Sequence, residues 1–533
     1  MANKSERVSM TNQTFEIGSR TDAIPIPSHT PIGVIGAGTM GSGIAQVAAV
    51  AGHRVKIFDT QTGAMARAIE SIKAALRRGI ARRTVSEQEA LAAVNRVVPV
   101  MGLEELADSG LVIEAIAENL ELKQDVFQGV EKIVAPDCIL ATNTSSLSIT
   151  ELAMALDRPK RFVGMHFFNP APLMELTEIV SGLATDPQII ATVAATAKAW
   201  NKTPVHARST PGFIVNRVAR PFYAEALRLL SERAADPATI DELVRESGGF
   251  RMGPFELMDL VGNDINFAVT QSVFRASFFD PRFTPSPIQQ EMVQAGFLGQ
   301  KSGRGFYRYA PGLNQPLPAF EPPASSPEKI SFAEPRPVTE TLLGRLQNAF
   351  PHASRSSRTD AAKLAQVNDA VLRLTDGRTA SRVAHELGTP NVVLIDLAHD
   401  YGKARTLAIS RSDQCSERAY RSIVGLLQTA GFNVVRLKDL PALVVMRIVT
   451  MVINEAADAV HYGVSNKCDV DLAMRKGLNY PAGPFGWAAR LGTTTVYQVL
   501  QNLATCYGED RYRTSPLIER SFWSGRRLDE ATD

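Results

Sequence analysis

The stretch that decides the fold is PIGVIGAGTMGSGIAQVAAVAGHRVKIFD, residues 31–59. A short apolar run at 32–35 leads into a G-x-G-x-x-G pattern, an amphipathic helical segment at 42–51 follows, and a second apolar run at 54–58 ends at an aspartate. The pattern consists of Gly36, Ala37, Gly38, Thr39, Met40 and Gly41. Strand, glycine turn, helix and strand in this order predict a dinucleotide-binding unit.

Each part of this unit has a physical role. Gly36 permits the tight turn, Gly38 lets the backbone approach a pyrophosphate, and Gly41 allows close packing of helix and strand. The N-terminus of the helix that follows offers N–H groups and the positive end of its dipole to phosphate, and Thr39 and Met40 of the loop are expected to contact the cofactor as well. Asp59, 23 residues after Gly36, can accept hydrogen bonds from the adenine ribose and would repel a 2′-phosphate, so we expect NAD rather than NADP. A glycine-rich turn without a ligand is the alternative.

The bulk composition narrows the class of protein. A chain of 533 residues is too long for one core and predicts about three domains. With 45% apolar residues, 21% charged residues and a net charge of +2, it is typical of a soluble enzyme and lacks the basic excess of a nucleic-acid-binding surface. We find no run long and apolar enough to span a membrane. The four scattered cysteines predict neither a disulfide framework nor a metal site, and they favour a cytoplasmic location.

Apolar runs alternate with helical patterns in the first part of the chain, which predicts a mostly parallel, doubly wound sheet. Further strands are expected at 111–115, 138–142, 161–165 and 175–180, and one or two long helices within 60–97. Helical periodicity dominates from Pro211 to about residue 309, and a proline-rich segment follows. The expected organisation is a flexible leader at 1–28, a Rossmann-type NAD-binding domain at 29–209, a helical domain at 210–309, a proline-rich linker at 310–338, a degenerate α/β segment at 339–439 and a second helical domain at 440–533.

The last of these domains is predicted from an internal repeat. A shift of 230 residues aligns 210–262 with 440–492 without a gap, and eleven of the 53 positions are identical. The shared residues include Arg217 and Arg447, Glu225 and Glu455, Asp241 and Asp471, and the Gly-Pro-Phe runs at 253–255 and 483–485. An ungapped match that ends in the same turn indicates a second copy of the helical domain. The segment before it contains strand-like runs but no glycine loop, so we expect it to bind no cofactor.

His166 is the candidate catalytic base. It follows the apolar strand expected at 161–165, at the carboxyl end where α/β sheets form their sites, and Glu178 lies twelve residues later on the next expected strand. A nicotinamide dehydrogenase needs a base for the hydroxyl proton, and a carboxylate beside the imidazole would fix its tautomer and strengthen it. From position alone, a structural histidine paired with an unrelated acid remains the alternative.

The chain resembles the 3-hydroxyacyl-CoA dehydrogenase family of fatty-acid β-oxidation. The resemblance extends in order from about residue 31 to 309 and rests on several motifs. They are the glycine loop, EAIAENLELK at 114–123, NTSSL at 143–147, HFFNP at 166–170, PGFIVNR at 211–217 and GPFEL at 253–257. The long form with a duplicated tail is similar to bacterial members, including those that act on 3-hydroxyadipyl-CoA in phenylacetate breakdown.

The resemblance implies NAD-dependent oxidation of a (3S)-3-hydroxyacyl-CoA to the 3-oxoacyl-CoA. It implies that His166 is the general base, that Glu178 orients it, and that Ser145 and Asn216 hydrogen-bond the substrate. The positions that match the dinucleotide-lining residues of the family are Glu118, Lys123, Asn143, Asn169 and Lys301. A serine and a lysine that contact CoA in the family are matched here by Ala75 and Arg82, so the serine is lost and a cation is kept.

Met446 replaces Asn216 in the second helical copy, and no HFFNP-like or NTSSL-like run precedes that copy, so we expect it to be inactive. In short family members the helical domain forms the dimer contact. Here the second copy either replaces that contact within one chain or a homodimer forms as well. Two other functions stay open at this point, namely a 3-hydroxy acid dehydrogenase that does not use CoA and a non-catalytic NAD-binding protein. The composition and motifs indicate neither a metal nor a nucleic-acid or membrane partner.

Overall fold

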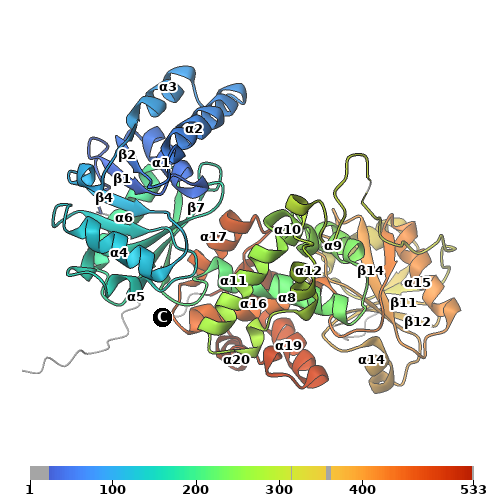
Figure 1. The fold of residues 1–533 in the computed structure, drawn as a ribbon. Coiled ribbons are helices and arrows are strands. Elements are labelled where there is room, and N and C mark those ends of the chain that lie inside the picture. The colour runs from blue at the N-terminus through green and yellow to red at the C-terminus, as the bar shows by residue number, and fades with distance from the viewer. Residues whose placement is uncertain (1–22, 314, 356–361, 531–533) are drawn as a thin grey trace, which may run out of the picture. The chain divides into compact units, whose positions relative to one another are not determined.

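The structure is a computed structural model that describes residues 23–313, 315–355 and 362–530. Most of the leader expected at 1–28 therefore lies outside the described residues. The described residues form two compact units. The first contains 23–143 together with 149–173 and 177–208, and the second contains 144–148, 174–176 and the described residues from 209 onward (Figure 1).

The first unit contains an eight-stranded sheet in the order β3-β2-β1-β4-β5-β6-β7-β8. The pairs from β3 to β6 are parallel, and β6 and β7 are antiparallel. This confirms the predicted doubly wound, mostly parallel sheet. The strands are β1 Ile32–Ile35, β2 Val55–Phe58, β3 Val97–Pro99, β4 Leu111–Glu114, β5 Ile139–Thr142, β6 Phe162–Phe167, β7 Leu176–Ser181 and β8 Thr203–Arg208.

Helices connect these strands, and the segment expected to hold one or two helices forms two, α2 and α3. A reciprocal capping box starts α3, because Ser86 accepts from the Glu89 amide while Glu89 accepts from the Ser86 amide. The helices are α1 Thr39–Val50, α2 Ala64–Ala81, α3 Glu87–Arg96, η2 Leu103–Leu106, α4 Leu120–Glu131, α5 Ile149–Ala153, η3 Pro159–Arg161 and α6 Pro187–Ala199.

The strand register brings the predicted cofactor motif to one edge of this sheet. All four residues of β1 are buried, and its last residue, Ile35, stands opposite Phe58 of β2 and Glu114 of β4. Because these strands are parallel, their carboxyl ends lie at the same edge. The glycine loop, Asp59 and the segment after Glu114 therefore leave the sheet side by side.

The second unit begins with the first helical copy. Asp241 fixes its Gly-Pro-Phe turn, because the carboxylate accepts from the amides of Phe255 at 3.0 Å and Glu256 at 2.8 Å. The helices are α7 Val215–Val218, α8 Arg220–Ser231, α9 Pro237–Glu246, α10 Pro254–Val261, α11 Asn263–Ala276, η4 Pro281–Phe283, α12 Pro287–Gln294 and η5 Gln300–Ser302.

A second sheet follows, in the order β10-β9-β11-β12-β13-β14-β15. It mixes parallel and antiparallel pairs, which confirms a second, degenerate α/β segment. Its first strand, β9, lies within the proline-rich residues 310–338. The elements are β9 Ile330–Phe332, α13 Glu340–Ala349, β10 Ser354–Arg355, β11 Lys363–Val367, β12 Ala370–Leu374, α14 Ala380–Leu387, β13 Val392–Ile395, β14 Thr406–Arg411, α15 Glu417–Thr429 and β15 Asn433–Arg436.

The second helical copy completes this unit and confirms the internal repeat. Asp471 accepts from the amides of Phe485 and Gly486 at 2.8 and 2.9 Å, as Asp241 does in the first copy. The helices are α16 Val445–His461, α17 Lys467–Leu478, α18 Pro484–Leu491, α19 Thr493–Tyr507, η6 Asp510–Tyr512 and α20 Pro516–Trp523.

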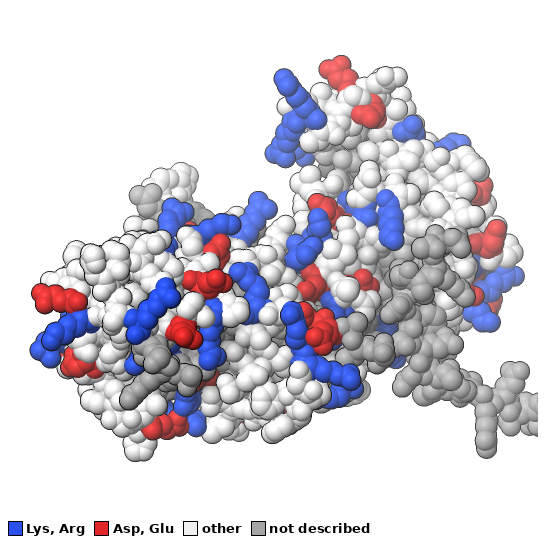
Figure 2. Space-filling view, turned by 180° about the vertical axis from the view of Figure 1, so that it is seen from behind, with Lys and Arg blue, Asp and Glu red and all other residues white. Residues whose placement is uncertain are grey.

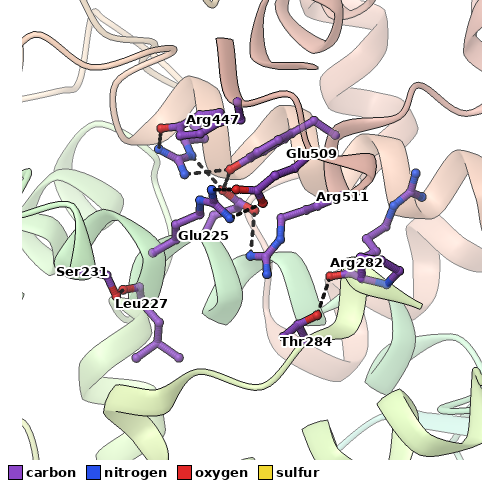
Figure 3. Close-up of polar contacts among 12 residues, drawn as sticks. Glu225, Leu227, Ser231, Arg282, Thr284, Arg447, Glu509 and Arg511 are labelled. Carbon is purple, nitrogen blue, oxygen red and sulfur yellow. Dashed lines mark hydrogen bonds and ion pairs between the residues drawn. The ribbon is translucent and has the colours of Figure 1, made fainter. Parts of the chain in front are cut away.

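Reciprocal ion pairs join α16 to the first helical copy. Arg217 Nε donates to Glu455 Oε1 and Arg447 Nε donates to Glu225 Oε2, each at 2.7 Å. Figure 3 shows Arg447 and Glu225 of this network. Each arginine thus pairs with the glutamate of the other copy, as in an interface between two related subunits.

The charges on the surface are mixed. On the face shown in Figure 2, Lys and Arg side chains are interspersed with Asp and Glu, in keeping with the net charge of +2. Within the described residues, no helix is both long enough and apolar enough to cross a membrane.

Candidate active site

The glycine loop has the geometry that its sequence predicts. Gly36 has a φ of +101°, and a Cβ there would lie 2.5 Å from the carbonyl oxygen of Ala115. A Cβ at Gly41 would lie 1.8 Å from the carbonyl oxygen of Gly36. At Gly38, in contrast, a Cβ would have no heavy atom of the described chain within 4 Å. The loop is closed around Gly36 and Gly41 and open at Gly38, which leaves space for a phosphate at the start of α1.

Asp59 connects the second strand to this loop. Its Oδ2 accepts from the Ala37 amide at 2.7 Å, and its Oδ1 accepts from the Gln61 amide at 2.8 Å. The carboxylate therefore stands at the loop, where the sequence predicts a ribose-binding acid. It also holds the loop in place, a second role that the spacing alone does not reveal.

A buried ion pair supports the edge of the sheet beside the loop. Glu114 is fully buried at the end of β4; its carboxylate accepts from Lys123 Nζ at 2.6 Å and from the Thr142 hydroxyl at 2.7 Å. Lys123 also contacts Glu118 at 3.2 Å. The sequence predicts Glu118 and Lys123 beside the dinucleotide, but it does not predict the supporting role of Glu114. An acid at the end of a fully buried strand is the signal that could have identified it.

His166 and Glu178, for which the sequence predicts a catalytic role, contact each other in the structure. They stand opposite each other on the antiparallel strands β6 and β7, and Nδ1 of His166 lies 2.7 Å from Oε2 of Glu178. Both residues are buried, with 6% and 0% exposure. Because a carboxylate can only accept, Nδ1 must donate, and the neutral ring then carries its lone pair on Nε2. That tautomer can accept a proton from an alcohol.

The segment after β5 provides two further candidates. Asn143 Oδ1 accepts from the Phe167 amide at 2.8 Å, so it joins β5 to the residue after His166. Ser145 is partly exposed and lies in a turn in which Thr144 Oγ1 accepts from the amides of Ser146 and Leu147. This turn belongs to the second unit. Asn169 is exposed after β6.

The remaining predicted residues lie on helices. Asn216 is partly exposed in α7, and its carbonyl oxygen accepts from Arg220 Nε at 2.8 Å. Lys301 forms an ion pair with Asp264 at 2.6 Å, and this lysine lowers the pKa of Asp264. Arg82 is exposed at the C-cap of α2, in the first unit. The structure therefore places His166 beside Glu178 and Asp59 beside the glycine loop, all within the first unit. Asn216 and Lys301 lie in the second unit.

Comparison with known proteins assigns this arrangement to a family. The sequence model of the NAD-binding domain of 3-hydroxyacyl-CoA dehydrogenases matches residues 31–210, and that of the C-terminal domain matches both 212–309 and 443–532. A model of the reduced Rossmann-fold domain of 3-hydroxybutyryl-CoA dehydrogenase matches residues 372–441. The chain belongs to the 3-hydroxyacyl-CoA dehydrogenase family.

Individual relatives agree with this assignment. The chain is 41% identical to a 3-hydroxyadipyl-CoA dehydrogenase of Escherichia coli K12, over 92% of this chain and 96% of that protein. It is 41% identical to a probable 3-hydroxybutyryl-CoA dehydrogenase of Bacillus subtilis, over 52% of this chain and 96% of the relative. The crystal structure of 3-hydroxybutyryl-CoA dehydrogenase from Escherichia coli K12 matches with a TM-score of 0.85 at 40% identity, covering 94% of this chain and 100% of that one.

Family membership confirms the predicted class of reaction. The chain is an oxidoreductase that uses NAD to oxidise the hydroxyl group of a 3-hydroxyacyl-CoA. The glycine loop fits this cofactor because it is open at Gly38 and the carboxylate of Asp59 contacts it at the Ala37 amide. The model of the C-terminal domain matches both helical copies. The segment between them matches a reduced Rossmann-fold domain, in agreement with the lack of a G-x-G-x-x-G motif in its sequence.

Proposed function

We propose that His166 is the general base of this dehydrogenase and that Glu178 positions it. Nε2 of the neutral ring would take the proton of the C3 hydroxyl, and in the reverse direction the imidazolium would return it. The buried carboxylate at 2.7 Å supports this assignment, because it holds the proton on Nδ1 and balances the charge that the ring gains. When bound, NAD accepts the hydride from C3.

The other predicted residues receive supporting roles in the same proposal. Ser145 and Asn216 would hydrogen-bond the substrate oxygen whose C–O bond order changes during the reaction. Glu118, Lys123, Asn143, Asn169 and Lys301 would line the dinucleotide, and Arg82 would contact a CoA phosphate. The ion pair of Lys123 with the buried Glu114 supports its part, since it fixes the ammonium group near the edge of the sheet.

We propose that the substrates include the six-carbon dicarboxylyl thioester 3-hydroxyadipyl-CoA. The proposal rests on the relative from Escherichia coli that carries this name and aligns with 92% of the chain. Activity on 3-hydroxyadipyl-CoA but not on free 3-hydroxyadipate would support it, with NADH formation followed by absorbance. Equal activity on the free acid would instead favour a dehydrogenase that does not use CoA.

The decisive test of the catalytic proposal is His166→Gln. We expect its turnover to fall at least about 100-fold, the lower range for loss of a general base, while NAD binding measured by calorimetry is retained. A loss of less than about fivefold would remove His166 from this role. Arg275→Met, which changes an exposed residue at the end of α11, provides a control for the effect of substitution itself.

We further propose that the second helical copy takes the place of a second subunit and that the enzyme acts in the cytoplasm without a nucleic-acid partner. The reciprocal pairs Arg217–Glu455 and Arg447–Glu225 support the first point, and the four free cysteines are consistent with a reducing compartment. Sedimentation analysis of the full chain tests the first point. A monomer would support it, whereas a stable homodimer would show that a further interface exists.

A further inference from the structure

A cavity of about 330 Å³ lies within the second unit, along one face of α8. Its size falls at the lower end of the range for small-molecule sites. Figure 3 shows Leu227 and Ser231 of α8, Thr284 and Arg511, four of the side chains that line it. The segment 283–287 and residues of α11 and α12 complete the lining. Neither the glycine loop nor the His166 pair contributes to this cavity.

Arg220 is the unusual member of the lining. Arg220 is only 5% exposed. Its Nε donates to the carbonyl oxygen of Asn216 at 2.8 Å, and its Nη1 donates to the Thr270 hydroxyl at 3.0 Å. Tyr223 lies beneath the guanidinium, 5.0 Å from it to the ring centroid. In the described part of the chain no carboxylate contacts Arg220, and burial lowers the pKa of its guanidinium. A buried charge without a counterion is costly unless a ligand provides one.

The other charged groups of the lining already have partners. Arg228 donates to Glu509 at 2.7 Å and to Glu232 at 3.1 Å. Glu232 also accepts from Arg447 at 2.9 Å. Arg511 lies 4.0 Å from Glu225. Among the described residues, Arg220 is thus the arginine of the lining that no carboxylate contacts, which makes it the candidate to bind an additional anion.

The lining of the cavity begins one helical turn beyond Asn216, which is not itself a lining residue. Positions 216, 220, 223 and 227 are separated by four, three and four residues, so they form one stripe along α7 and α8. Arg220 is one turn beyond Asn216, and its Nε reaches back to the Asn216 carbonyl. An acyl chain bound beside Asn216 and extending along this stripe would reach Arg220.

The second helical copy lacks both residues together. At the positions equivalent to Asn216 and Arg220 stand Met446 and Thr450, both buried. The same copy keeps Arg447 and Glu455, which join the two copies. The copy that we expect to be inactive therefore offers neither the amide of Asn216 nor the guanidinium of Arg220 at these positions.

We propose that Arg220 binds the terminal carboxylate of a dicarboxylyl-CoA substrate and that the cavity along α8 holds the outer part of its acyl chain. Arg220 is then a specificity-determining residue, because its guanidinium offers N–H donors in the fork that a carboxylate accepts. A terminal methyl group would leave the buried charge without a partner. This inference rests on the proposed dehydrogenase function and on the placement of the reacting carbon near Asn216.

The test compares two six-carbon thioesters, 3-hydroxyadipyl-CoA and 3-hydroxyhexanoyl-CoA, by kcat/KM. We expect the unaltered enzyme to prefer the adipyl thioester and Arg220→Met to reduce the adipyl-to-hexanoyl ratio about 30-fold or more. Arg220→Lys keeps the charge but loses the forked pair of donors, so its adipyl-to-hexanoyl ratio should lie between those of the unaltered enzyme and Arg220→Met. Arg275→Met, at an exposed arginine outside the cavity, should leave the ratio unchanged.

A second measurement needs no variant. A 3-hydroxyadipyl-CoA analogue with a terminal amide has the same length and no charge, so we expect it to behave like the hexanoyl thioester with the unaltered enzyme. Equal kcat/KM for the acid and its amide would overturn the assignment of Arg220, as would an unchanged ratio in a folded Arg220→Met protein. If the unaltered enzyme oxidises neither thioester, the proposed function fails instead.

Discussion

Replacing Glu178 by glutamine would separate the catalytic effect of its charge from the effect of its shape. The side chain is fully buried, and its Oε2 lies 2.7 Å from Nδ1 of His166. When the ring takes a proton, this hydrogen bond becomes one between two charged groups. Hydrogen bonds to charged groups contribute about 1.5–3 kcal/mol, so their loss in the transition state corresponds to about 10- to 150-fold in rate.

Glutamine adds a second effect, because its amide N–H group can donate to Nδ1. The ring would then carry its proton on Nε2 and could not accept one from the substrate. We therefore expect Glu178→Gln to lower kcat about 100-fold to 10,000-fold. The upper limit is the loss of about 10,000-fold seen when an amide replaces the carboxylate beside a catalytic histidine and holds the ring in the wrong tautomer. Glu178→Ala, which removes the charge but cannot fix the wrong tautomer, should lose less. Glu178→Asp should retain the most.

Steady-state oxidation of a 3-hydroxyacyl-CoA with NAD, read as NADH absorbance, gives kcat and KM for each variant. Calorimetric binding of NAD and the melting temperature show whether each protein is folded and loads its cofactor. A kcat for Glu178→Gln within about fivefold of the unaltered enzyme would refute the reasoning. So would a loss confined to KM, because the pair is predicted to act in the chemical step.

Three further results are expected. Asp59→Ala should weaken NAD binding and reduce the preference for NAD over NADP, because it removes the carboxylate that repels a 2′-phosphate; unchanged affinities in titrations would contradict this. Arg447→Met should lower the free energy of unfolding by about 3–5 kcal/mol, since it removes the 2.7 Å ion pair of the buried Glu225 and leaves Arg511, 4.0 Å away, as its nearest cation. Urea titration would check this value, and Arg382→Met, at an exposed ion pair, should cost less than about 1 kcal/mol. Burial lowers the pKa of His206 from 6.5 to about 4 in the folded protein. The unfolded chain therefore binds more protons between these values, and stability should decline by up to about 3 kcal/mol as the pH falls from 6.5 to 4. His206→Asn should flatten this part of a melting-temperature profile, and an equally steep profile would exclude His206 as its source.

Local patterns were sufficient to predict the cofactor domain. The alternation of apolar runs and helical segments predicts the sheet, and the glycine spacing predicts a turn that only glycines can form at Gly36 and Gly41. The pairing of His166 with Glu178 also follows from local information, because His166 directly follows one expected strand and Glu178 lies on the next. The antiparallel register that places them directly opposite each other comes from the fold.

Residues whose partners are distant in the sequence could not be placed in this way. Glu114 contacts Lys123 nine residues later and Thr142 28 residues later, and only the neighbouring strand ends bring these groups together. The internal repeat was visible in the sequence, but the partner of Arg217 was not. Glu225 lies only eight residues away on the next helix, yet Arg217 pairs with Glu455 because α7 and α16 pack against each other.

The duplicated helical domain shows which constraints act on each copy. Arg217, Arg447, Glu225 and Glu455 stand at matching positions of the two copies, and each ion pair joins one copy to the other. A change at any of these positions removes one ion pair from the contact between the copies. Positions of the second copy that match substrate-binding residues of the first take part in no such pair, and we expect this copy to bind no substrate. There, Asp396 accepts from the amides of residues 444, 445 and 446 at 2.8–3.0 Å, so a side chain of the degenerate sheet covers the N-terminus of α16. Both copies thus carry the arginine and the glutamate that join them, whereas only the first copy carries the residues proposed to bind the substrate.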